Sequence, residues 1–371
     1  MNPAWQVHPV PVPDSLEDDD AWALHAMTDL DRLVNEAVWG HDDLAYPAAA
    51  SLAKMRDEHY TRRAHLVAVS PDRPRDVVGA ALVRLPQHGN SHLLEVDLLV
   101  HPEHEGHGVD DALLTATLAS ARAAGRSVVV LSSEHTREPA AGDPDALVAP
   151  TGSGRISRTD PGATLAERFG FTLEQAERYS LLPLPVAPER LAELHRSAAA
   201  HAGPDYRTLT WQDRCPDRWV DDYARLETRM STDAPSAGLE TAEDPWDEQR
   251  VRVAEAATAE AGRGSLVTVV EHVPTGTLAG FTMVEFPRQS PEIVFQQDTL
   301  VLREHRGRRL GLLIKAVNLE HLATLRPHAR RLHTWNAEEN AHMLAINIAL
   351  GFVPVGVYGV WQKHVEAATH R

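Results

Sequence analysis

The sequence predicts an α/β (α+β) chain made of two tandem copies of one domain, each a mixed, mostly antiparallel sheet flanked by helices. The main reason is an internal repeat. DLLVHPEHEGH at 97–107 and DTLVLREHRGR at 298–308 share six of eleven positions, at an offset of 298 − 97 = 201 residues. The same offset relates Gly79 to Gly280. A period this long indicates a duplicated domain, because solenoid repeats are much shorter.

The first copy follows an acidic, Pro-rich segment, residues 1–18, that predicts a flexible arm. Apolar residues at helical spacing then predict helices, and β-rich runs bounded by Gly or Pro predict strands. These patterns give helices at 19–38, 48–62 and 110–124, and strands at 65–70, 77–85, 91–100 and 127–131. The Gly-, Pro- and Asp-rich stretch 135–162 predicts a loop. We therefore place the first domain at 19–187.

The second copy repeats this order after a predicted linker helix, and occupies 205–371 with the linker at 188–204. Its patterns predict helices at 217–230, 246–261, 310–325 and 338–349. A hairpin at 265–286 and strands at 293–302 and 330–335 precede the closing strands. Two helices, a meander, a strand–turn–helix and closing strands form an α/β unit of ordinary domain size.

Composition limits the functional classes. The chain has 43% hydrophobic and 24% charged residues, which is typical of a globular protein with real cores. A net charge of −17 argues against a nucleic-acid partner. No apolar run is long enough to span a membrane, and the N-terminus does not resemble a signal peptide. The single cysteine, Cys215, excludes an intrachain disulfide framework and a cysteine-rich zinc site, and predicts a cytoplasmic location.

The turn at 303–311, REHRGRRLG, carries the strongest chemical signal. Backbone N–H groups at a helix N-terminus bind anions, and Gly307 and Gly311 allow the backbone to approach a ligand closely. Arg306, Arg308 and Arg309 add forked donors suited to phosphate. The sequence contains neither Gly-Lys-Ser/Thr nor G-x-G-x-x-G, which excludes a P-loop and a dinucleotide fingerprint. A solvated basic helix start remains the alternative.

The element order and this turn resemble the GNAT superfamily of N-acetyltransferases, in a tandem layout similar to that of mycothiol synthase. In the family's acetyl-CoA loop, Arg/Gln-x-x-Gly-x-Gly/Ala, Arg306 takes the first place and Gly311 the last, while Arg309 replaces the first glycine. Asn340 and the Gly351–Phe352 pair match the family's closing pattern. The resemblance covers about 20–187 and 205–365.

The resemblance implies an acyl-CoA-dependent N-acyltransferase, a transferase that moves acetyl from acetyl-CoA to a primary amine of a small molecule by direct attack. No metal is expected. Asp298 is the candidate base, with a structural role as its alternative, and Tyr358 is the candidate acid for the thiolate. Asn336 and Asn340 bond the cofactor or cap the following helix. The expected cofactor-binding residues are Leu300, Val301, Leu302, Arg306, Gly307, Arg308, Arg309, Leu310, Gly311, Leu312, Asn336 and Asn340.

The first copy departs from the loop pattern and is expected to be degenerate. Glu105 replaces the arginine and Asp110 the last glycine, and these carboxylates repel a pyrophosphate. The nearby histidines, His101, His104 and His107, lie on a turn, so we discount a metal site. The tyrosine that the family often uses as acid is replaced by Asn347 in the second copy.

Alternatives within this interpretation stay open. The acceptor is a small molecule or, as a second choice, a protein N-terminus or lysine. The segment 230–249, which includes Asp244 and Trp246, is expected to form the acceptor pocket, although an acidic surface loop explains it equally well. A catalytically inactive acyl-CoA sensor or scaffold is the alternative from a different class. The chain is expected to act as a monomer or homodimer.

Overall fold

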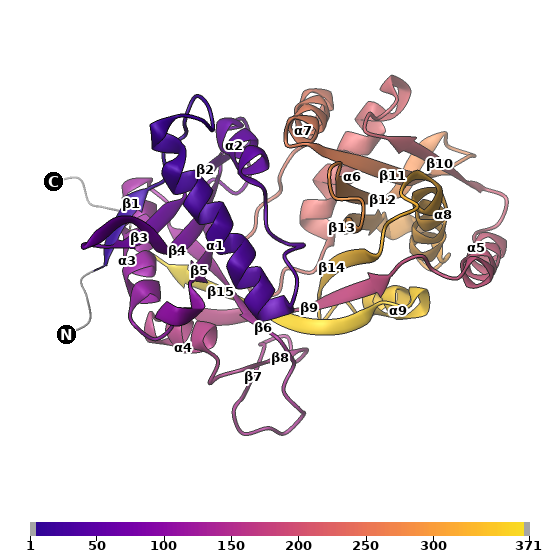
Figure 1. Cartoon of the computed structure of the whole chain (residues 1–371). Coiled ribbons are helices and arrows are strands. Elements are labelled where there is room, and N and C mark those ends of the chain that lie inside the picture. The colour runs from indigo at the N-terminus through magenta and orange to yellow at the C-terminus, as the bar shows by residue number, and fades with distance from the viewer. Residues whose placement is uncertain (1–4, 367–371) are drawn as a thin grey trace. The chain divides into compact units, whose positions relative to one another are not determined.

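The computed structural model describes residues 5–366 and divides into two compact units (Figure 1). Unit 1 consists of Met1–Glu177, Ala237–Glu240 and Gly356–Arg371, and unit 2 of Arg178–Ser236 and Thr241–Val355. The predicted mixed α/β class and duplicated fold are confirmed, whereas the predicted boundaries differ from this division. No helix among residues 5–366 has the length and apolarity needed to cross a membrane.

Unit 1 is a sheet with helices on both faces. Its strand order is β1-β3-β4-β5-β6-β15-β9, with β2 on β4, and β7 and β8 form a separate hairpin inside the predicted loop. The elements are β1 (Gln6–Pro9), α1 (Trp22–Trp39), α2 (Ala48–Arg56), β2 (Thr61–Arg63), β3 (Leu66–Ser70), β4 (Arg73–Pro86), β5 (Leu93–Val100), α3 (Val109–Ala123), β6 (Val128–His135), β7 (Ala146–Val148), β8 (Arg155–Ser157), α4 (Pro161–Arg168) and β9 (Thr172–Pro183).

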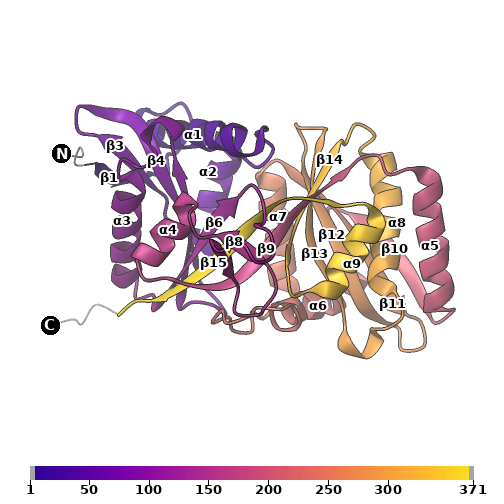
Figure 2. The same ribbon diagram turned by 90° about the horizontal axis from the view of Figure 1, so that it is seen from below.

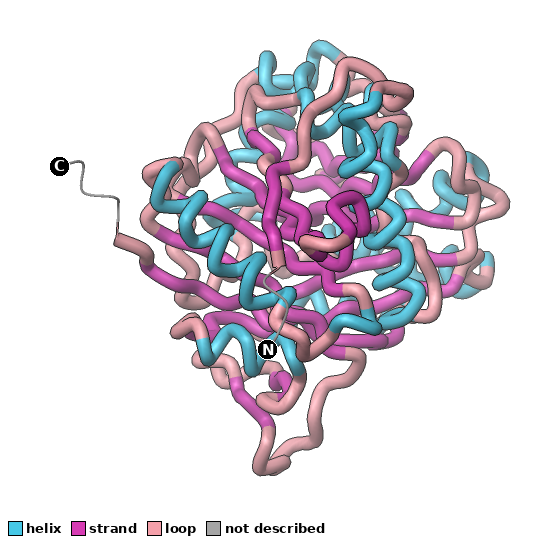
Figure 3. The backbone as a smooth tube through the Cα atoms, turned by 60° about the vertical axis from the view of Figure 1, so that its left-hand side comes forward, coloured by secondary structure: helices cyan, strands magenta, loops and turns pink. Residues whose placement is uncertain are grey.

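Unit 2 repeats this plan with the strand order β10-β11-β12-β13-β14-β9. Helices flank its strands, as the secondary-structure colours of Figure 3 show for both units. The elements are α5 (Pro188–Ala202), β10 (Tyr206–Gln212), α6 (Val220–Asp233), α7 (Glu248–Glu260), β11 (Arg263–His272), β12 (Thr277–Pro287), β13 (Ile293–Val301), α8 (Leu310–Leu325), β14 (Arg331–Ala337) and α9 (Ala341–Leu350). The last strand, β15 (Val353–His364), starts in unit 2 and belongs to unit 1 from Gly356.

Each unit borrows a strand from the other half of the sequence. From Val357 onward, β15 pairs antiparallel with β6 of unit 1, with Val357 opposite His135 and His364 opposite Val128. The second half of β9, from Arg178, belongs to unit 2 and neighbours β14. The prediction that the second domain runs uninterrupted to residue 371 was therefore wrong, because its last strand completes the sheet of unit 1.

The N-terminal segment was also predicted incorrectly. Residues Gln6–Pro9 form β1, which pairs antiparallel with β3, and Val10 is buried in the core beneath α1. Residues 1–4 lie outside the described part of the chain. The predicted linker helix exists as α5, but it packs on α8 inside unit 2 and is part of that unit (Figure 2).

The two faces of each sheet bury separate cores, as strand alternation requires. In unit 1, Ala80 faces the core beneath α1 and α2, while Ala81 faces the core beneath α3 and α4. In unit 2, α6 and α7 cover one face, and α8 lies on the other with α5 outside it. Because α8 is covered on nearly every side, its interior residues are buried all round, including Lys315.

Candidate active site

The site of unit 2 begins where two parallel strands diverge. β13 and β14 pair at only three positions, the last being Phe295 opposite His333. Within the described residues, β13 continues to Val301 and β14 to Ala337 without further pairing to each other. The backbone edges that face this divergence are free to pair with an extended ligand, as an exposed sheet edge does. The two strands β13 and β14 therefore separate beyond Phe295 and His333.

A β-bulge lies on β13, one of the two strands that diverge. Thr282 pairs with Thr299 but Val284 pairs with Gln296, so β13 carries an extra residue at positions 297–298. Bulges leave a residue unpaired, re-aim side chains and occur frequently beside active sites. The equivalent pair in unit 1, β4 and β5, keeps a single register from Gly79 to Arg84. The bulge thus distinguishes unit 2 from unit 1.

The loop after β13 presents backbone donors. Gly307 has φ 80° and Arg309, the residue before α8, has φ 56°, so both are left-handed. Within residues 5–366, the N–H groups of residues 307–312 have no hydrogen-bond acceptor, and the first helical bond joins Leu313 N–H to the Arg309 carbonyl at 3.0 Å. These donors and the positive end of the helix dipole form an anion site.

The three arginines of the loop differ in their availability. The Arg306 guanidinium donates to the Val301 carbonyl at 2.9 Å and pairs with Asp233 at 3.1 Å, so its charge is already compensated. Arg308 and Arg309 are exposed and have no carboxylate within ion-pair distance among the described residues. Arg309 makes one side-chain bond, to Ser197 Oγ at 3.2 Å. Arg308 and Arg309 are therefore available to an anion, while Arg306 ties the loop to β13 and α6.

The strand and helix on either side of the loop have packing roles that the sequence did not specify. Leu300 and Leu302 are buried in the core beneath α6, so only their backbone faces a ligand. Leu310 is likewise buried, in the core beneath α5. A Cβ at Gly311 would lie 3.0 Å from Ile346 Cδ1, so a glycine lets α8 and α9 approach. The predicted cofactor contacts of Leu300 and Leu302 would therefore use their backbone.

Two predicted asparagines separate in role. Asn340 caps α9, because its Oδ1 accepts the Met343 N–H at 3.2 Å. Asn336 makes no such cap within residues 5–366. Its Oδ1 accepts from Asn347 Nδ2 at 2.6 Å, and Asn347 Oδ1 accepts from Lys315 Nζ at 2.7 Å. A chain of hydrogen bonds thus runs from Lys315 through Asn347 to Asn336. Asn336 lies on β14 beyond His333, the last residue of β14 that pairs with β13.

Two carboxyl groups in unit 2 are perturbed together. Burial, with the charge of Glu285 in second place, raises the pKa of Asp298 to about 6. Burial and then the charge of Asp298 raise the pKa of Glu227, on α6, to about 8, although a hydrogen bond from Tyr223 opposes the shift. Adjacent groups with raised pKa values suit proton transfer near neutral pH.

The sequence interpretation missed Glu227. A signal was present, since Tyr223, Leu226 and Met230 recur at helical spacing and Glu227 lies on the same stripe. Its side chain is only 7% exposed. A carboxyl group on an apolar helix face is costly to bury, so it points to a function or a structural pair.

Tyr358 does not belong to unit 2. Its hydroxyl donates to Glu134 Oε1 at 3.1 Å, and its ring stacks on Trp39 with centroids 6.0 Å apart, all within unit 1. The prediction of Tyr358 as the acid of the second copy was wrong, because residues from Gly356 onward complete the sheet of unit 1. Burial and the charge of Asp97 raise the pKa of Glu134 to about 7.

The predicted acceptor segment uses its acidic residues internally. Asp233 binds the loop arginines, Asp244 pairs with Arg250, and Asp247 caps α7 by accepting the Arg250 N–H at 2.8 Å. Glu240 belongs to unit 1. Asp233, Asp244 and Asp247 are therefore committed to structural contacts.

The corresponding loop of unit 1 offers a different surface. Asp110 and Asp111 occupy the first turn of α3, where Arg168 pairs with Asp111 at 2.8 Å. Trp5 Nε1 donates to the His107 carbonyl at 2.9 Å, so the N-terminal segment is anchored on this loop. Carboxylates at a helix N-terminus occupy the position that a pyrophosphate would take.

Unit 1 also contains a Ser–His–Asp array. His135 lies 2.8 Å from Ser133 Oγ and 2.7 Å from Asp160 Oδ2, as in hydrolase triads. However, Trp361 Nε1 already donates to Ser133 Oγ at 2.8 Å, and a Cβ at Gly359 would lie 2.7 Å from the same oxygen. A substrate carbonyl has no room beside this hydroxyl, so the array is a buried structural network.

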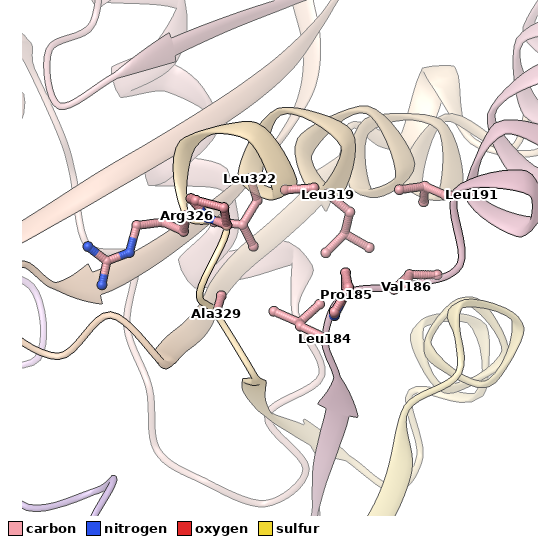
Figure 4. A pocket seen from close by; sticks show the side chains of 10 residues that line it. Leu184, Pro185, Val186, Leu191, Leu319, Leu322, Arg326 and Ala329 are labelled. Carbon is pink, nitrogen blue, oxygen red and sulfur yellow. The ribbon is translucent and has the colours of Figure 1, made fainter.

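Two cavities of unit 2 are placed differently with respect to the loop. A small apolar cavity of about 30 Å³ lies between 184–186 and the C-terminal half of α8, including Leu319 and Leu322 (Figure 4). The loop adjoins the N-terminal end of this helix, whose 16 residues span roughly 24 Å. A polar cavity of about 390 Å³ adjoins the loop itself. It is lined by Arg225, Arg229, Thr232, Asp233, Leu302, Arg303 and Glu304.

Comparisons with known proteins agree with this geometry. The family model "Acetyltransferase (GNAT) family" matches residues 24–142. A solved tandem GNAT protein from the clavulanic acid biosynthesis pathway, determined without acetyl-CoA, is 25% identical, with a TM-score of 0.70 over 99% of this chain and 100% of that chain. The chain has a tandem GNAT fold, with a GNAT acetyltransferase domain at residues 24–142. GNAT proteins generally transfer acetyl groups from acyl-CoA.

Two further GNAT structures match at the level of fold. A GCN5-related N-acetyltransferase from Sphaerobacter thermophilus is 13% identical, with a TM-score of 0.60 over 97% of this chain and 95% of that one. A glucosamine N-acetyltransferase region of a fungal multi-domain β-N-acetylglucosaminidase is 14% identical, with a TM-score of 0.57 over 98% of this chain and 38% of that one. No curated protein matches the chain in a sequence comparison.

The family model falls on the copy that the loop residues predicted to be degenerate. The family match reports the fold of residues 24–142, whereas the loop residues bear on ligand binding. Residues 24–142 carry the helices and strands of the GNAT core, whereas ligand binding depends on a few positions at the start of one helix. The GNAT domain of unit 1 is therefore compatible with a poor CoA loop.

Proposed function

We propose that unit 2 is an acyl-CoA-dependent N-acyltransferase that transfers acetyl from acetyl-CoA to a primary amine of a small molecule. The proposal rests on the arrangement of the loop at the end of β13. The open amides of residues 307–312, flanked by Arg308 and Arg309, lie at the end of a bulged strand that has separated from its parallel neighbour. A diphosphate needs such donors, and an extended amide-bearing arm needs such a strand edge.

In this proposal the substrate pyrophosphate takes the amides at the start of α8, and Arg308 and Arg309 screen its charge. The pantetheine amides pair with the free edge of β13 between the loop and the bulge. The extra residue at 297–298 leaves a backbone N–H in reach of the thioester oxygen, where negative charge develops during attack. The contacts to pantetheine and to the thioester oxygen use the backbone of β13, which explains why the side chains of Leu300 and Leu302 can remain in the core.

The amine must lose a proton before or during attack, and we assign that proton to Glu227. The buried carboxyl group, with its pKa raised to about 8, is matched to an amine that reacts near neutral pH. Asp298 supplies the charge that raises it and attracts the ammonium form of the acceptor. Asp298 therefore assists binding, in place of the base role that the sequence suggested.

The acceptor class follows from the acidic pair, since the negative charge of Asp298 beside the buried Glu227 favours a cation. A cytoplasmic location, where acyl-CoA is available, belongs to the same proposal. The alternative of an inactive acyl-CoA sensor draws on the asparagine, Asn347, at the position of the family's acid. A sensor needs the loop but has no use for a perturbed carboxyl pair.

The test measures free thiol released from acetyl-CoA with a panel of primary amines, together with acetyl-CoA binding by calorimetry. We expect binding that is weakened in Arg309→Glu and kept in Glu105→Arg, and thiol release above the hydrolysis background with at least one amine. Binding without release from any amine would favour the sensor. Tighter binding in Glu105→Arg, with no change in Arg309→Glu, would place the ligand in unit 1 and overturn the proposal.

A further inference from the structure

The last turns of α5 contact the anion-binding loop of unit 2. Ala198 and Ala202 are buried in the core between α5 and α8. Ser197 and His201 lie four residues apart, so they share one face of the helix beside this apolar stripe. His201 Nε2 lies 3.2 Å from the Gly307 carbonyl oxygen. At the repeat offset of 201 residues, positions 197 and 201 have no counterpart in the first copy, so these contacts distinguish unit 2.

The contact with His201 fixes the orientation of one peptide group in the loop. A carbonyl oxygen only accepts hydrogen bonds, so Nε2 of His201 carries the proton and donates it to Gly307. In a planar trans peptide, the carbonyl of one residue and the N–H of the next point in opposite directions. Holding the Gly307 carbonyl toward α5 therefore turns the N–H of Arg308 away from α5. This N–H is one of the open amides of the anion site.

The loop needs such support at two positions. Gly307 has no side chain, so its peptide plane can rotate more freely than that of other residues, and a rotated plane would present a carbonyl dipole that repels an anion. Arg309 has φ 56°, a left-handed conformation that is unfavourable for a residue other than glycine. Ser197 Oγ accepts a hydrogen bond from the Arg309 guanidinium at 3.2 Å, so α5 contacts this residue as well.

The first copy holds its loop differently. Gly106 corresponds to Gly307 at the repeat offset, and its carbonyl has no donor among residues 5–366. Trp5 Nε1 donates instead to the carbonyl of His107, one residue later. The peptide group that His201 orients in unit 2 is therefore not held in this way in unit 1.

We propose that α5 holds the loop of unit 2 in its anion-binding conformation and that His201 is the positioning residue, acting through the peptide between Gly307 and Arg308. This inference rests on the proposed acyl transfer in unit 2, because the anion is the diphosphate of the acyl-CoA donor. His201 does not touch the thioester or the amine. Its loss should therefore weaken binding of the donor and leave the chemical step unchanged.

The assignment predicts a loss that depends on the phosphates of the donor. Replacing His201 with Leu should raise the KM and Kd for acetyl-CoA about 2- to 10-fold, the range for one hydrogen bond, with kcat unchanged. Inorganic pyrophosphate, titrated by calorimetry, should lose affinity by a similar factor, which provides a readout that is independent of activity. S-acetylpantetheine lacks the diphosphate, so its kcat/KM should be the same in wild type and variant. A general structural defect would lower the rates with both thioesters.

The experiment compares wild type, His201→Leu and His201→Gln in the full chain. Glutamine keeps an N–H donor at a similar distance from the backbone, so it should restore most of the affinity. The matched control is Arg196→Leu, which also places a leucine at an exposed position of α5. Arg196 pairs with Glu193 of the same helix at 2.6 Å and should leave donor binding unchanged. Because His201 is exposed, urea titrations should give the same stability for wild type and His201→Leu.

Outcomes for the two proposals separate. If wild type transfers acetyl and His201→Leu binds acetyl-CoA equally well, or loses rate equally with S-acetylpantetheine, the positioning role is wrong and acyl transfer stands. If wild type binds acetyl-CoA but releases thiol with no amine, acyl transfer fails, and the titrations with acetyl-CoA and pyrophosphate still decide the role of His201. If wild type binds neither ligand, both proposals fail. A phosphate-dependent loss in His201→Leu, restored in His201→Gln and absent from Arg196→Leu, supports the assignment.

Discussion

The pH profile of acyl transfer is the sharpest consequence of the Glu227–Asp298 pair. With a pKa of about 8, only roughly a tenth of Glu227 is ionised at pH 7, so kcat/KM should rise with pH and level off above about 8. Replacing Glu227 with Gln removes the proton acceptor and should lower the plateau by about 10²- to 10⁴-fold, the range for general base catalysis. Glu260→Gln, the same change at an exposed position of α7, serves as the control.

The acceptor amine itself titrates, so a rising limb alone does not identify the base. Asp298→Asn separates the two sources, because losing the neighbouring negative charge lowers the pKa of Glu227 and leaves the amine in solution unchanged. The limb should move to lower pH in this variant. Thiol release recorded from pH 6 to 9.5 provides the profile. A limb that stays at the pKa of the amine in all variants, or a Glu227→Gln enzyme with near-normal kcat, would refute the assignment.

Three further outcomes are expected. Arg309→Glu should raise the KM for acetyl-CoA about tenfold or more, whereas Glu105→Arg in unit 1 should leave it unchanged, both measured by thiol release. Gly311→Val places a side chain where a Cβ already lies 3.0 Å from Ile346, and should lower the free energy of unfolding of unit 2 by about 1–3 kcal/mol in urea titrations. Lys315 binds a proton more weakly when folded, so stability should rise with pH between about 7 and 10.5, and Lys315→Met should flatten that rise in denaturant titrations.

The fold was predictable because it is encoded locally and twice. Helical spacing, β-rich runs and turn residues recur at a constant offset, so each copy supports the assignment of the other. The loop was predictable for the same reason, since its amides belong to one strand–turn–helix. These features depend on residues close together in sequence, where periodicity and turn chemistry are informative.

The exchange of β9 and β15 was not predictable, because strand pairing across more than 200 residues has no local signature. Val357 pairs with His135, and no pattern in 353–364 specifies that partner. The wrong assignment of Tyr358 follows directly from this. Arg306 was overvalued for a related reason, since its partner Asp233 lies in a helix 73 residues away.

Features other than the charge of the loop also distinguish unit 2 from unit 1. Unit 2 combines a bulge, uncompensated arginines and a perturbed carboxyl pair, all around one strand end. In unit 1 the equivalent strand is regular and carboxylates occupy the helix start. Burial also raises carboxyl pKa values there, that of Asp31 to about 6 and that of Glu134 to about 7, so the raised pKa values alone do not distinguish the units. Because β15 supplies Tyr358 to unit 1, truncating the chain after Leu350 would expose the edge of β6. An isolated catalytic half is therefore a poor test of function, and single substitutions in the full chain are the informative ones.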